Sequence, residues 1–215
     1  MVKRGLTRDA LVATAHQYVG ANGLDALTMR RLAAAADVSP GALYKHFQDR
    51  KDLQRAMADA IYATIDLADI DTADPSVEQV KSCCERMRRA MLAFRDGGRI
   101  IAGTYAPLAA TLKLSATLIT LLQAVTAPEH SPGQLAALLR SYTTGFVIDE
   151  QAFLELKGTD EWDSLVQQIA DSGHHRAADA EDLIAILTDD RDERFHTGLD
   201  MILTGLVRAG VAPPN

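Results

Sequence analysis

Helix start and stop signals in the first 50 residues place the tightest limit on how this chain folds. Apolar side chains recur at helical spacing from about Thr7, and Asn22-Gly23 offers the left-handed turn that commonly ends a helix. Thr28 is then a suitable N-cap for a second helix over about 29–36. The sequence therefore predicts two helices in quick succession.

A tight turn and a third short helix follow. In the turn at 37–41, Ser39 is a suitable N-cap, and Pro40 takes the first helical position, where its missing N–H costs nothing. The third helix is predicted over about 40–47. A helix, a short helix, a turn and a second short helix form the helix-turn-helix arrangement, whose last helix enters the major groove of DNA.

The composition of residues 40–47 suits this task. Leu43 and Phe47 stand four residues apart and are expected to face inward, and Arg30 on the preceding helix extends toward the groove. The residues expected to face outward are Gly41, Ala42, Tyr44, Lys45 and His46. Small residues let the backbone approach base edges, whereas the longer polar side chains reach phosphates.

Charge is unevenly distributed along the chain. The first 55 residues hold nine Lys or Arg against five Asp or Glu, whereas the whole chain carries a net charge of −7. A basic front segment on an acidic protein is expected when only that segment approaches a polyanion, because phosphate attraction is screened over roughly 10 Å. A solvated surface explains the same imbalance, so the charge supports DNA binding only together with the motif.

The rest of the chain predicts an all-α fold. Apolar residues make up 47% of the chain and aromatic residues 5%, and the period-two alternation typical of strands is scarce. Helices are predicted over about 49–67, 77–94, 108–125, 131–153, 181–187 and 192–209, with a short helix or turn over 100–105. Residues 158–180 are expected to form a mobile loop that holds at most one helical turn. We expect an N-terminal three-helix DNA-binding domain over 1–50, a connecting helix over 51–67, and a larger helical ligand-binding and dimerisation domain over 68–215.

Two further features concern location and cofactors. The uncharged run 114–127 is 14 residues long, which suits a buried helix better than a membrane span, and the N-terminus shows no apolar signal segment. Cys83 and Cys84 are adjacent, so they cannot form the spaced pairs that bind zinc, and at about 100° apart on a helix at most one should face the core. We expect a cytoplasmic protein with no cofactor, no metal site and no membrane partner.

The larger domain contains a candidate apolar cavity. Its predicted lining residues are Met87, Met91, Phe94, Ile101, Thr104, Tyr105, Leu112, Leu122, Tyr142 and Phe146, with Asp149 as the conspicuous polar group. This composition suits a hydrophobic or aromatic ligand. The methionines are explained equally well as ordinary core residues. Asp149 is explained equally well by a hydrogen bond to neighbouring backbone or to a side chain across a dimer.

The C-terminal helices predict a homodimer, because their wide apolar faces exceed what one subunit covers. The candidate interface residues are Leu139, Phe195, Leu199, Ile202 and Leu206. Gly198 and Gly205 stand seven residues apart in the last helix. Glycine costs roughly 1 kcal/mol there relative to alanine, so close approach of another helix is expected.

Two segments carry a family resemblance. Residues 26–33 and 38–47, which read Ala-Leu-Thr-Met-Arg-Arg-Leu-Ala and Val-Ser-Pro-Gly-Ala-Leu-Tyr-Lys-His-Phe, resemble the TetR family of transcriptional regulators, over about residues 7–55. The resemblance implies phosphate contacts from Thr28, Tyr44, His46 and Arg50. It also implies base-edge or groove contacts from Arg30, Pro40, Gly41, Ala42 and Lys45.

The second half resembles the tetracycline-repressor branch of that family, through residues 95–98, 145–151 and 198–206. The branch implies a histidine two residues before the Gly103-Thr104 pair, which helps bind drug-borne magnesium, and an Arg-Pro after the pair. This chain has Ile101 and Tyr105-Ala106 there. Near the end of the fourth helix it has Ile65-Asp66 where a drug-contacting histidine is expected, so the metal-linked tetracycline site is mostly missing.

These observations predict a homodimeric transcriptional repressor. It would bind a palindromic DNA operator and be released by a small hydrophobic or aromatic effector, either an antibiotic-like compound or a metabolite. The alternative is an architectural or ligand-independent DNA-binding dimer. An enzyme is not expected, because the sequence shows no catalytic triad, P-loop, dinucleotide fingerprint or His-Glu metal pair.

Overall fold

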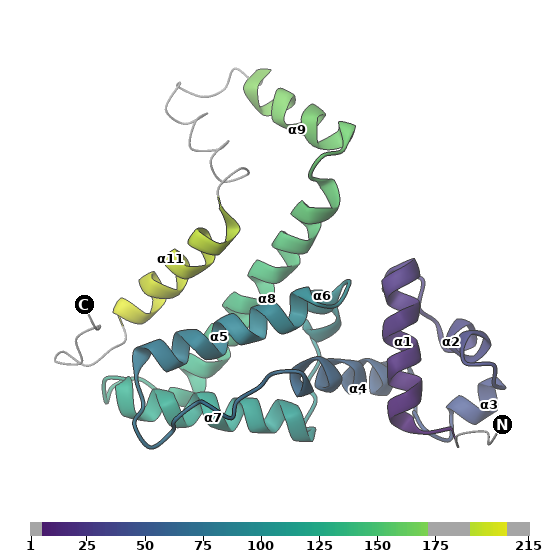
Figure 1. Cartoon of the computed structure of the whole chain (residues 1–215), viewed down its shortest axis with the longest axis horizontal. Coiled ribbons are helices and arrows are strands. Elements are labelled where there is room, and N and C mark those ends of the chain that lie inside the picture. The colour runs from purple at the N-terminus through teal and green to yellow at the C-terminus, as the bar shows by residue number, and fades with distance from the viewer. Residues whose placement is uncertain (1–5, 172–189, 206–215) are drawn as a thin grey trace.

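The computed structural model describes residues 6–171 and 190–205, and this part of the chain is built from helices without strands. The helices are α1 (Arg8–Asn22), α2 (Met29–Ala35), α3 (Pro40–Leu43), α4 (Arg50–Ala63), α5 (Val77–Leu92), α6 (Gly97–Ile101), α7 (Ala109–Val125), α8 (Pro132–Leu156), α9 (Asp160–Asp171) and α11 (Arg191–Thr204). Figure 1 shows α1 to α3 as a small head at one end, from which α4 runs into a larger body of α5 to α8. The all-α prediction is therefore confirmed.

Side-chain caps set the helix starts in the head, as predicted. Thr28 accepts a hydrogen bond from the Arg31 N–H at 3.2 Å, Ser39 from the Ala42 N–H at 3.3 Å, and Asp49 from the Asp52 N–H at 2.7 Å. Each cap satisfies one of the N–H groups that the first helical turn leaves without a backbone partner. These three contacts fix the helix-turn-helix geometry locally.

The third helix is shorter than predicted. It ends at Leu43, and residues 44–46 form turns in which the His46 and Phe47 N–H groups both donate to the Leu43 carbonyl at 2.9 Å. Leu43 and Phe47 are buried as expected, at 0% and 1% exposure. The inward anchors of the segment are therefore correct although its helical boundary is not.

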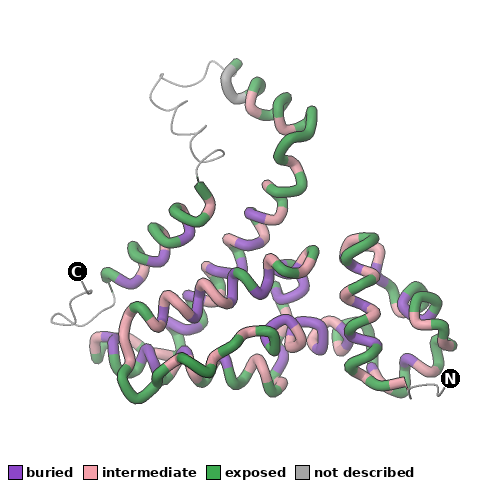
Figure 2. The backbone as a smooth tube through the Cα atoms, in the orientation of Figure 1, coloured by how far each residue is buried: buried purple, intermediate pink, exposed green. Residues whose placement is uncertain are grey.

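The core of the head continues into the body. One hydrophobic cluster includes Leu11, Leu32 and Phe47 of the head, Met57 of α4 and Met91 of α5. Figure 2 shows buried residues following α4 from the head into the body. Helix α4 thus packs against both parts, and the domain boundaries at 50 and 67 stay predictions.

A second cluster fills the far side of the body, between α5, α7, α8 and α11. Within it Arg88 and Glu150 are both buried, and two hydrogen bonds of 2.8 and 2.6 Å join them. Burial alone would lower the pKa of Arg88, but the carboxylates of Glu150 and Asp192 outweigh this effect and raise it. The pair links α5 to α8 inside an otherwise apolar region.

Several expectations for the body need correction. Residues 160–171 form α9, not a loop, because Thr159 caps the helix and Trp162 packs edge-on against Phe153 at 5.1 Å. Cys83 and Cys84 are both fully buried, because neighbouring elements cover both sides of α5 at this position. The short helix lies at 97–101, three residues earlier than predicted. The predicted helix over 181–187 lies outside the described residues.

Gly198 confirms the expected close approach, whereas Gly205 does not. A Cβ at Gly198 would lie 2.0 Å from the Tyr142 hydroxyl oxygen, which is far too close. That hydroxyl donates to the Phe195 carbonyl of α11 at 2.9 Å. A Cβ at Gly205 would meet nothing within 4 Å. Gly198 therefore lets α8 and α11 meet through a tyrosine.

Candidate DNA interface and ligand site

The head presents exposed polar side chains beside its turn. Tyr44 is 55% exposed at the end of α3, and Arg30, Lys45 and Arg50 are also exposed. Within the described residues none of these three cations forms an ion pair, and the strongest contact of Arg50 is a long 3.4 Å hydrogen bond to the Leu24 carbonyl. Their charges are therefore available to phosphate.

The remaining predicted DNA contacts belong to the same helix-turn-helix segment. Thr28, Pro40 and Gly41 are exposed, and Ala42 and His46 are half-buried. The Thr28 hydroxyl oxygen already accepts a hydrogen bond as the α2 cap, which leaves its proton to donate to a phosphate oxygen. The head brings together all the residues that the sequence assigned to DNA, and their individual roles stay predictions.

Arg8 is a residue of the head that the sequence reasoning missed. Its guanidinium lies 4.4 Å from the centre of the Phe47 ring, donates to the His46 carbonyl, and pairs with Asp52 at 2.7 Å. The hydrogen bond from Arg8 is the main reason that the pKa of Asp52 is lowered. Arg8 therefore ties the segment after α3 to the start of α4, across a sequence distance that no local pattern reveals.

Hydrogen bonds also tie the head to the body. Asp96 accepts from the Leu24 N–H at 2.8 Å, and Arg99 pairs with Asp25 at 2.8 Å. The Gln54 amide of α4 donates to the Ile100 carbonyl at 3.1 Å. These contacts place the Asp96-Gly97-Gly98 segment of the tetracycline-repressor resemblance at the joint between the head and the body.

A hollow of about 440 Å³ lies between α4, α5, α7 and α8, and we call it the inner pocket. Its lining residues are Tyr62, Met87, Thr104, Tyr105, Ala106, Pro107, Thr111, Leu114, Ser115, Leu118, Ile119, Gly133, Ala136, Ala137 and Arg140. Apolar and small side chains dominate, with a few hydroxyl groups and one cation. This volume and composition are typical of small-molecule sites.

Helix α4 contributes directly to the inner pocket through Tyr62 in its last turn. Asp59, one turn earlier, accepts hydrogen bonds of 2.8 Å from both the N–H and the hydroxyl of Thr111, which lines the pocket from α7. The wall of the pocket is therefore connected to the helix that begins in the head.

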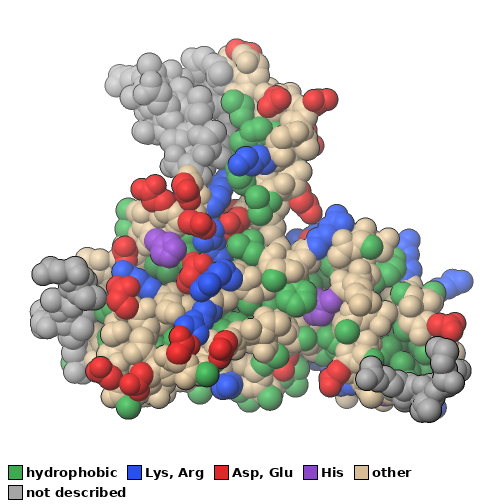
Figure 3. All heavy atoms as spheres, in the orientation of Figure 1, with side chains coloured by type: hydrophobic (Ala, Val, Ile, Leu, Met, Phe, Trp, Pro, Cys, Tyr) green, Lys and Arg blue, Asp and Glu red, His purple; other side chains and the backbone are tan. Residues whose placement is uncertain are grey.

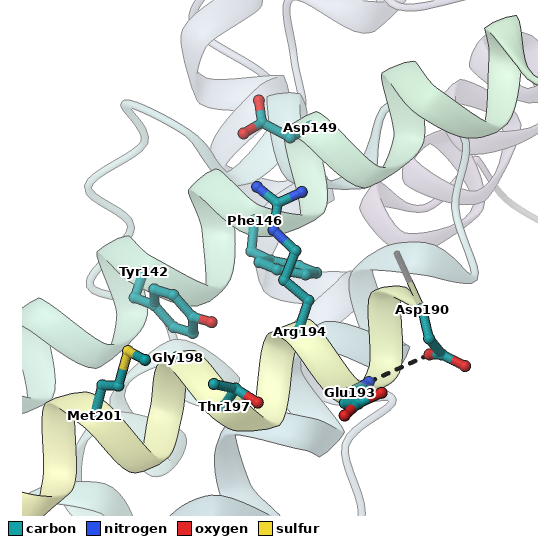
Figure 4. Close-up of a pocket in the computed structure, with 9 residues that line it drawn as sticks. All are labelled: Tyr142, Phe146, Asp149, Asp190, Glu193, Arg194, Thr197, Gly198 and Met201. Carbon is teal, nitrogen blue, oxygen red and sulfur yellow. Dashed lines mark hydrogen bonds between the residues drawn. The ribbon is translucent and has the colours of Figure 1, made fainter. Parts of the chain in front are cut away.

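A second hollow is the open groove between α8 and α11, drawn in Figure 4. Tyr142 and Phe146 project from α8 toward α11, and Asp149 points away from the centre of the groove. The α11 side is polar and includes Glu193, Arg194 and Thr197. Met201 stands at one end and is 74% exposed.

The structure does not gather the predicted ligand residues into one cavity. Met87, Thr104 and Tyr105 line the inner pocket, whereas Tyr142, Phe146 and Asp149 line the α8–α11 groove on another face of α8. Phe94 lines a cleft beside His16 of the head. Met91, Ile101 and Leu122 are buried in the packed cores, and Leu112 is 54% exposed. The prediction of a single cavity from these residues is therefore wrong.

The predicted dimer residues also need correction. Leu139, Phe195 and Leu199 are each 0% exposed, because they form the packing of α8 against α11 within one chain. They have no surface left for a partner. Ile202 is half-buried and stays a prediction, and Leu206 lies outside the described residues.

Two further observations limit the chemistry of the described residues. No group of three or more His, Cys, Asp or Glu side chains within them is placed to hold a metal ion. None of their helices has the length and hydropathy of a membrane span. On the face drawn in Figure 3, acidic and basic side chains alternate over α5 and α11.

Comparisons with known proteins agree with this geometry. Residues 11–57 match the family model for bacterial regulatory proteins of the tetR family, and residues 73–209 match that for the tetracyclin repressor-like C-terminal domain. The tetracycline repressor protein class C of Escherichia coli is 31% identical over 94% of this chain and 90% of its own length.

Two solved structures show the same architecture in bound states. The Streptomyces coelicolor TetR family protein ActR in complex with actinorhodin is 26% identical with a TM-score of 0.76, covering 93% of this chain and 96% of its own. BioQ with its natural double-stranded DNA operator is 26% identical with a TM-score of 0.68, and the match covers 93% of this chain and 97% of the BioQ chain.

Proposed function

The chain belongs to the TetR family of bacterial regulatory proteins, and from this premise we propose that it is a homodimeric, ligand-released repressor of transcription. The family places it among DNA-binding transcriptional regulators rather than enzymes. The observation that supports the DNA-binding role most directly is the capped turn before α3. Around it Arg30, Lys45 and Arg50 are exposed and have no carboxylate partner in the part of the chain that the structure describes. We infer that the protein acts in the cytoplasm, where its DNA is.

Each head is proposed to place α3 in a major groove. Tyr44, His46, Arg50 and Thr28 would hold the phosphates, and Arg30 and Lys45 would reach base edges together with the small residues at 40–42. Two heads of a dimer then read half-sites about 34–36 Å apart, or a multiple of that spacing, which favours a palindromic operator.

The outer faces of α8 and α11 are proposed to meet the same faces of a second copy. Met201 and Leu138 are 74% and 46% exposed on these two helices, and Tyr142 and Phe146 are half-buried beside them. Exposed apolar side chains on these two helices favour association with a second subunit, because the contact buries them. This face replaces the set of residues that the sequence pointed to.

The inner pocket is proposed as the effector site, because it lies among the helices of the body and reaches α4 through Tyr62. A ligand there contacts Tyr62 directly and Thr111, which is bonded to Asp59. A shift of α7 or α8 around the ligand would thus move α4 and the head that it carries. The ligand can weaken DNA binding only because it binds the DNA-released arrangement more tightly than the DNA-bound one. This difference in binding free energy is typically about 1–3 kcal/mol.

Binding to the inverted repeat beside the protein's own gene tests the DNA-binding role. Arg50→Ala should weaken binding to operator and random DNA alike and reduce the slope of log affinity against log salt by about 0.9, because one phosphate contact is lost. Arg89→Ala is the matched control. Arg89 is an exposed residue of α5 in the body, so its loss should change neither the affinity nor the salt slope. An unchanged slope in Arg50→Ala would contradict the phosphate assignment.

The ligand-independent alternative predicts a different outcome in the same assay. If no small molecule alters operator affinity and Tyr105→Ala has no effect on any response, the protein is an architectural DNA-binding dimer. A ligand response that changes in Tyr105→Ala while operator affinity stays constant supports the inner pocket as the effector site.

A further inference from the structure

Two polar groups in the inner pocket have no counterpart within the described chain. Arg140 lines the pocket from α8 and is half-buried. No ion pair found in residues 6–171 and 190–205 includes it. The Tyr62 hydroxyl lies on the α4 side, in a side chain only 5% exposed, and no hydrogen-bond partner for it is present among the described residues.

The isolation of Arg140 is unusual for this body. The arginines of α5 and of the segment that includes α6 all have carboxylate partners: Arg86 pairs with Asp69, Arg88 with Glu150, Arg89 with Glu85, Arg95 with Glu155 and Arg99 with Asp25. None of the residues that line the inner pocket is acidic. Arg140 therefore lines a mostly apolar pocket with no acidic side chain beside it, and an anionic ligand would supply the missing counter-ion.

The Tyr62 hydroxyl has a definite protonation state. Burial raises the pKa of Tyr62 to about 12, and the positive charge of Arg140 acts in the opposite direction. At neutral pH the phenol therefore keeps its proton and can donate a hydrogen bond. A buried donor left without an acceptor costs about 1–3 kcal/mol, which an acceptor oxygen on a ligand would recover.

We infer that the inner pocket binds a small organic anion, an aromatic carboxylate whose apolar ring system packs among the α7 and α8 side chains. One carboxylate oxygen meets the guanidinium of Arg140, and an oxygen of the same group accepts the Tyr62 hydrogen bond. This inference rests on the proposed function and names the chemical class of the effector. It replaces Asp149, which lies on another face of α8, as the polar determinant of the site.

The charge of the ligand also explains how binding could reach the head. Tyr62 belongs to the last turn of α4, and Arg140 belongs to α8. An anion bonded to both residues would add a polar link between the end of α4 and α8, which no hydrogen bond or ion pair between side chains of these two helices makes within the described residues. The α4 position set by the anion would then differ from the position in the empty pocket.

Matched pairs of probes test the inference on the free protein, without DNA. Benzoate, cinnamate and 2-naphthoate are each titrated calorimetrically beside their neutral amides. At least one carboxylate should bind about tenfold or more tightly than its amide, as expected for a charge-assisted hydrogen bond in an apolar site. This preference should disappear in Arg140→Met, return in Arg140→Lys, shrink in Tyr62→Phe, and persist in the control Arg89→Met.

Thermal unfolding of the ligand-free variants separates a binding role from a structural one. Removal of an unpaired cation or an unpartnered hydroxyl should leave the melting temperature unchanged or raise it, whereas loss of a structural contact would lower it. The inference is overturned if every amide binds as well as its carboxylate, if no carboxylate binds at about 1 mM, or if the preference survives in Arg140→Met. Because no DNA is present, failure here is distinct from failure of operator binding, which would overturn the proposed function instead.

Discussion

The head and the body differ in whether their Lys and Arg side chains have acidic partners. On the head, Arg30, Lys45 and Arg50 are exposed and pair with no carboxylate within residues 6–171 and 190–205, whereas in the body Arg86, Arg88 and Arg99 form ion pairs with acidic side chains. Free surface cations cost little in water and attract phosphate, while cations near a core need partners. The difference separates a surface for a polyanion from a scaffold. Arg140 differs from Arg86, Arg88 and Arg99 in that it has no ion pair among the described residues.

The largest expected effect comes from breaking the buried pair in the body. Glu150→Ala should lower the free energy of unfolding by about 3 kcal/mol, because it removes the buried partner of Arg88 and leaves it the exposed Asp192 and the more distant Glu85, at 3.7 Å. Chemical denaturation of purified protein measures this.

Glu155→Ala, on the same helix, is the control for that variant. Glu155 is exposed and meets Arg95 at 3.6 Å, so its loss should cost about 0–1 kcal/mol. Equal losses in the two variants would show that burial does not distinguish the ion pairs of the body.

An intermediate effect is expected on the surface of the head. Arg30→Ala should reduce discrimination between the operator and a single-base variant by about 2 kcal/mol at one position, because a base-edge contact is removed. Affinities for a set of operator variants at fixed salt measure this. Arg31→Ala is the control, since Arg31 bonds to the Ala26 carbonyl. Identical discrimination profiles in both variants would refute base reading by Arg30.

The smallest effect concerns the one strong ion pair within the head. The pKa of Asp52 is lowered, chiefly by the Arg8 hydrogen bond, so its stabilising contribution is present above its unfolded pKa, near 3.8, and is lost as pH falls through the lower folded value. Asp52→Asn should therefore cost about 0.5–1 kcal/mol near neutral pH. The difference from the parent protein should shrink toward about pH 3.

Urea denaturation of both proteins at several pH values measures this difference. A loss that stays constant down to about pH 3 would show that the Asp52 charge is not the source of the stabilisation.

Local signals made the head predictable from sequence. Thr28, Ser39 and Asp49 each cap a helix through a residue three positions away, so a short stretch of sequence contains both partners. The Arg8 contact with Asp52 was missed because its partners lie on different helices. The length of α3 was overestimated because Leu43 and Phe47 keep their spacing across turns that follow the helix.

The inner pocket was less predictable, because helix periodicity shows that a face is apolar without showing what covers it. On α8, Tyr142, Phe146 and Asp149 were predicted to line the ligand cavity, yet they line the groove beside α11 and not the inner pocket. Arg140 and Tyr62 carry no local signal of their own. Their significance comes from the packing that leaves them on the wall of one hollow without partners.

The two adjacent cysteines of α5 have a practical consequence. Burial raises the pKa of Cys83 to about 11 and that of Cys84 to about 12, so almost no thiolate exists at neutral pH and no reagent reaches either sulfur. Alkylation of these thiols can therefore begin only when α5 separates from its neighbours. The rate of labelling would report opening of the body alone, from within the intact protein and without an added fluorophore.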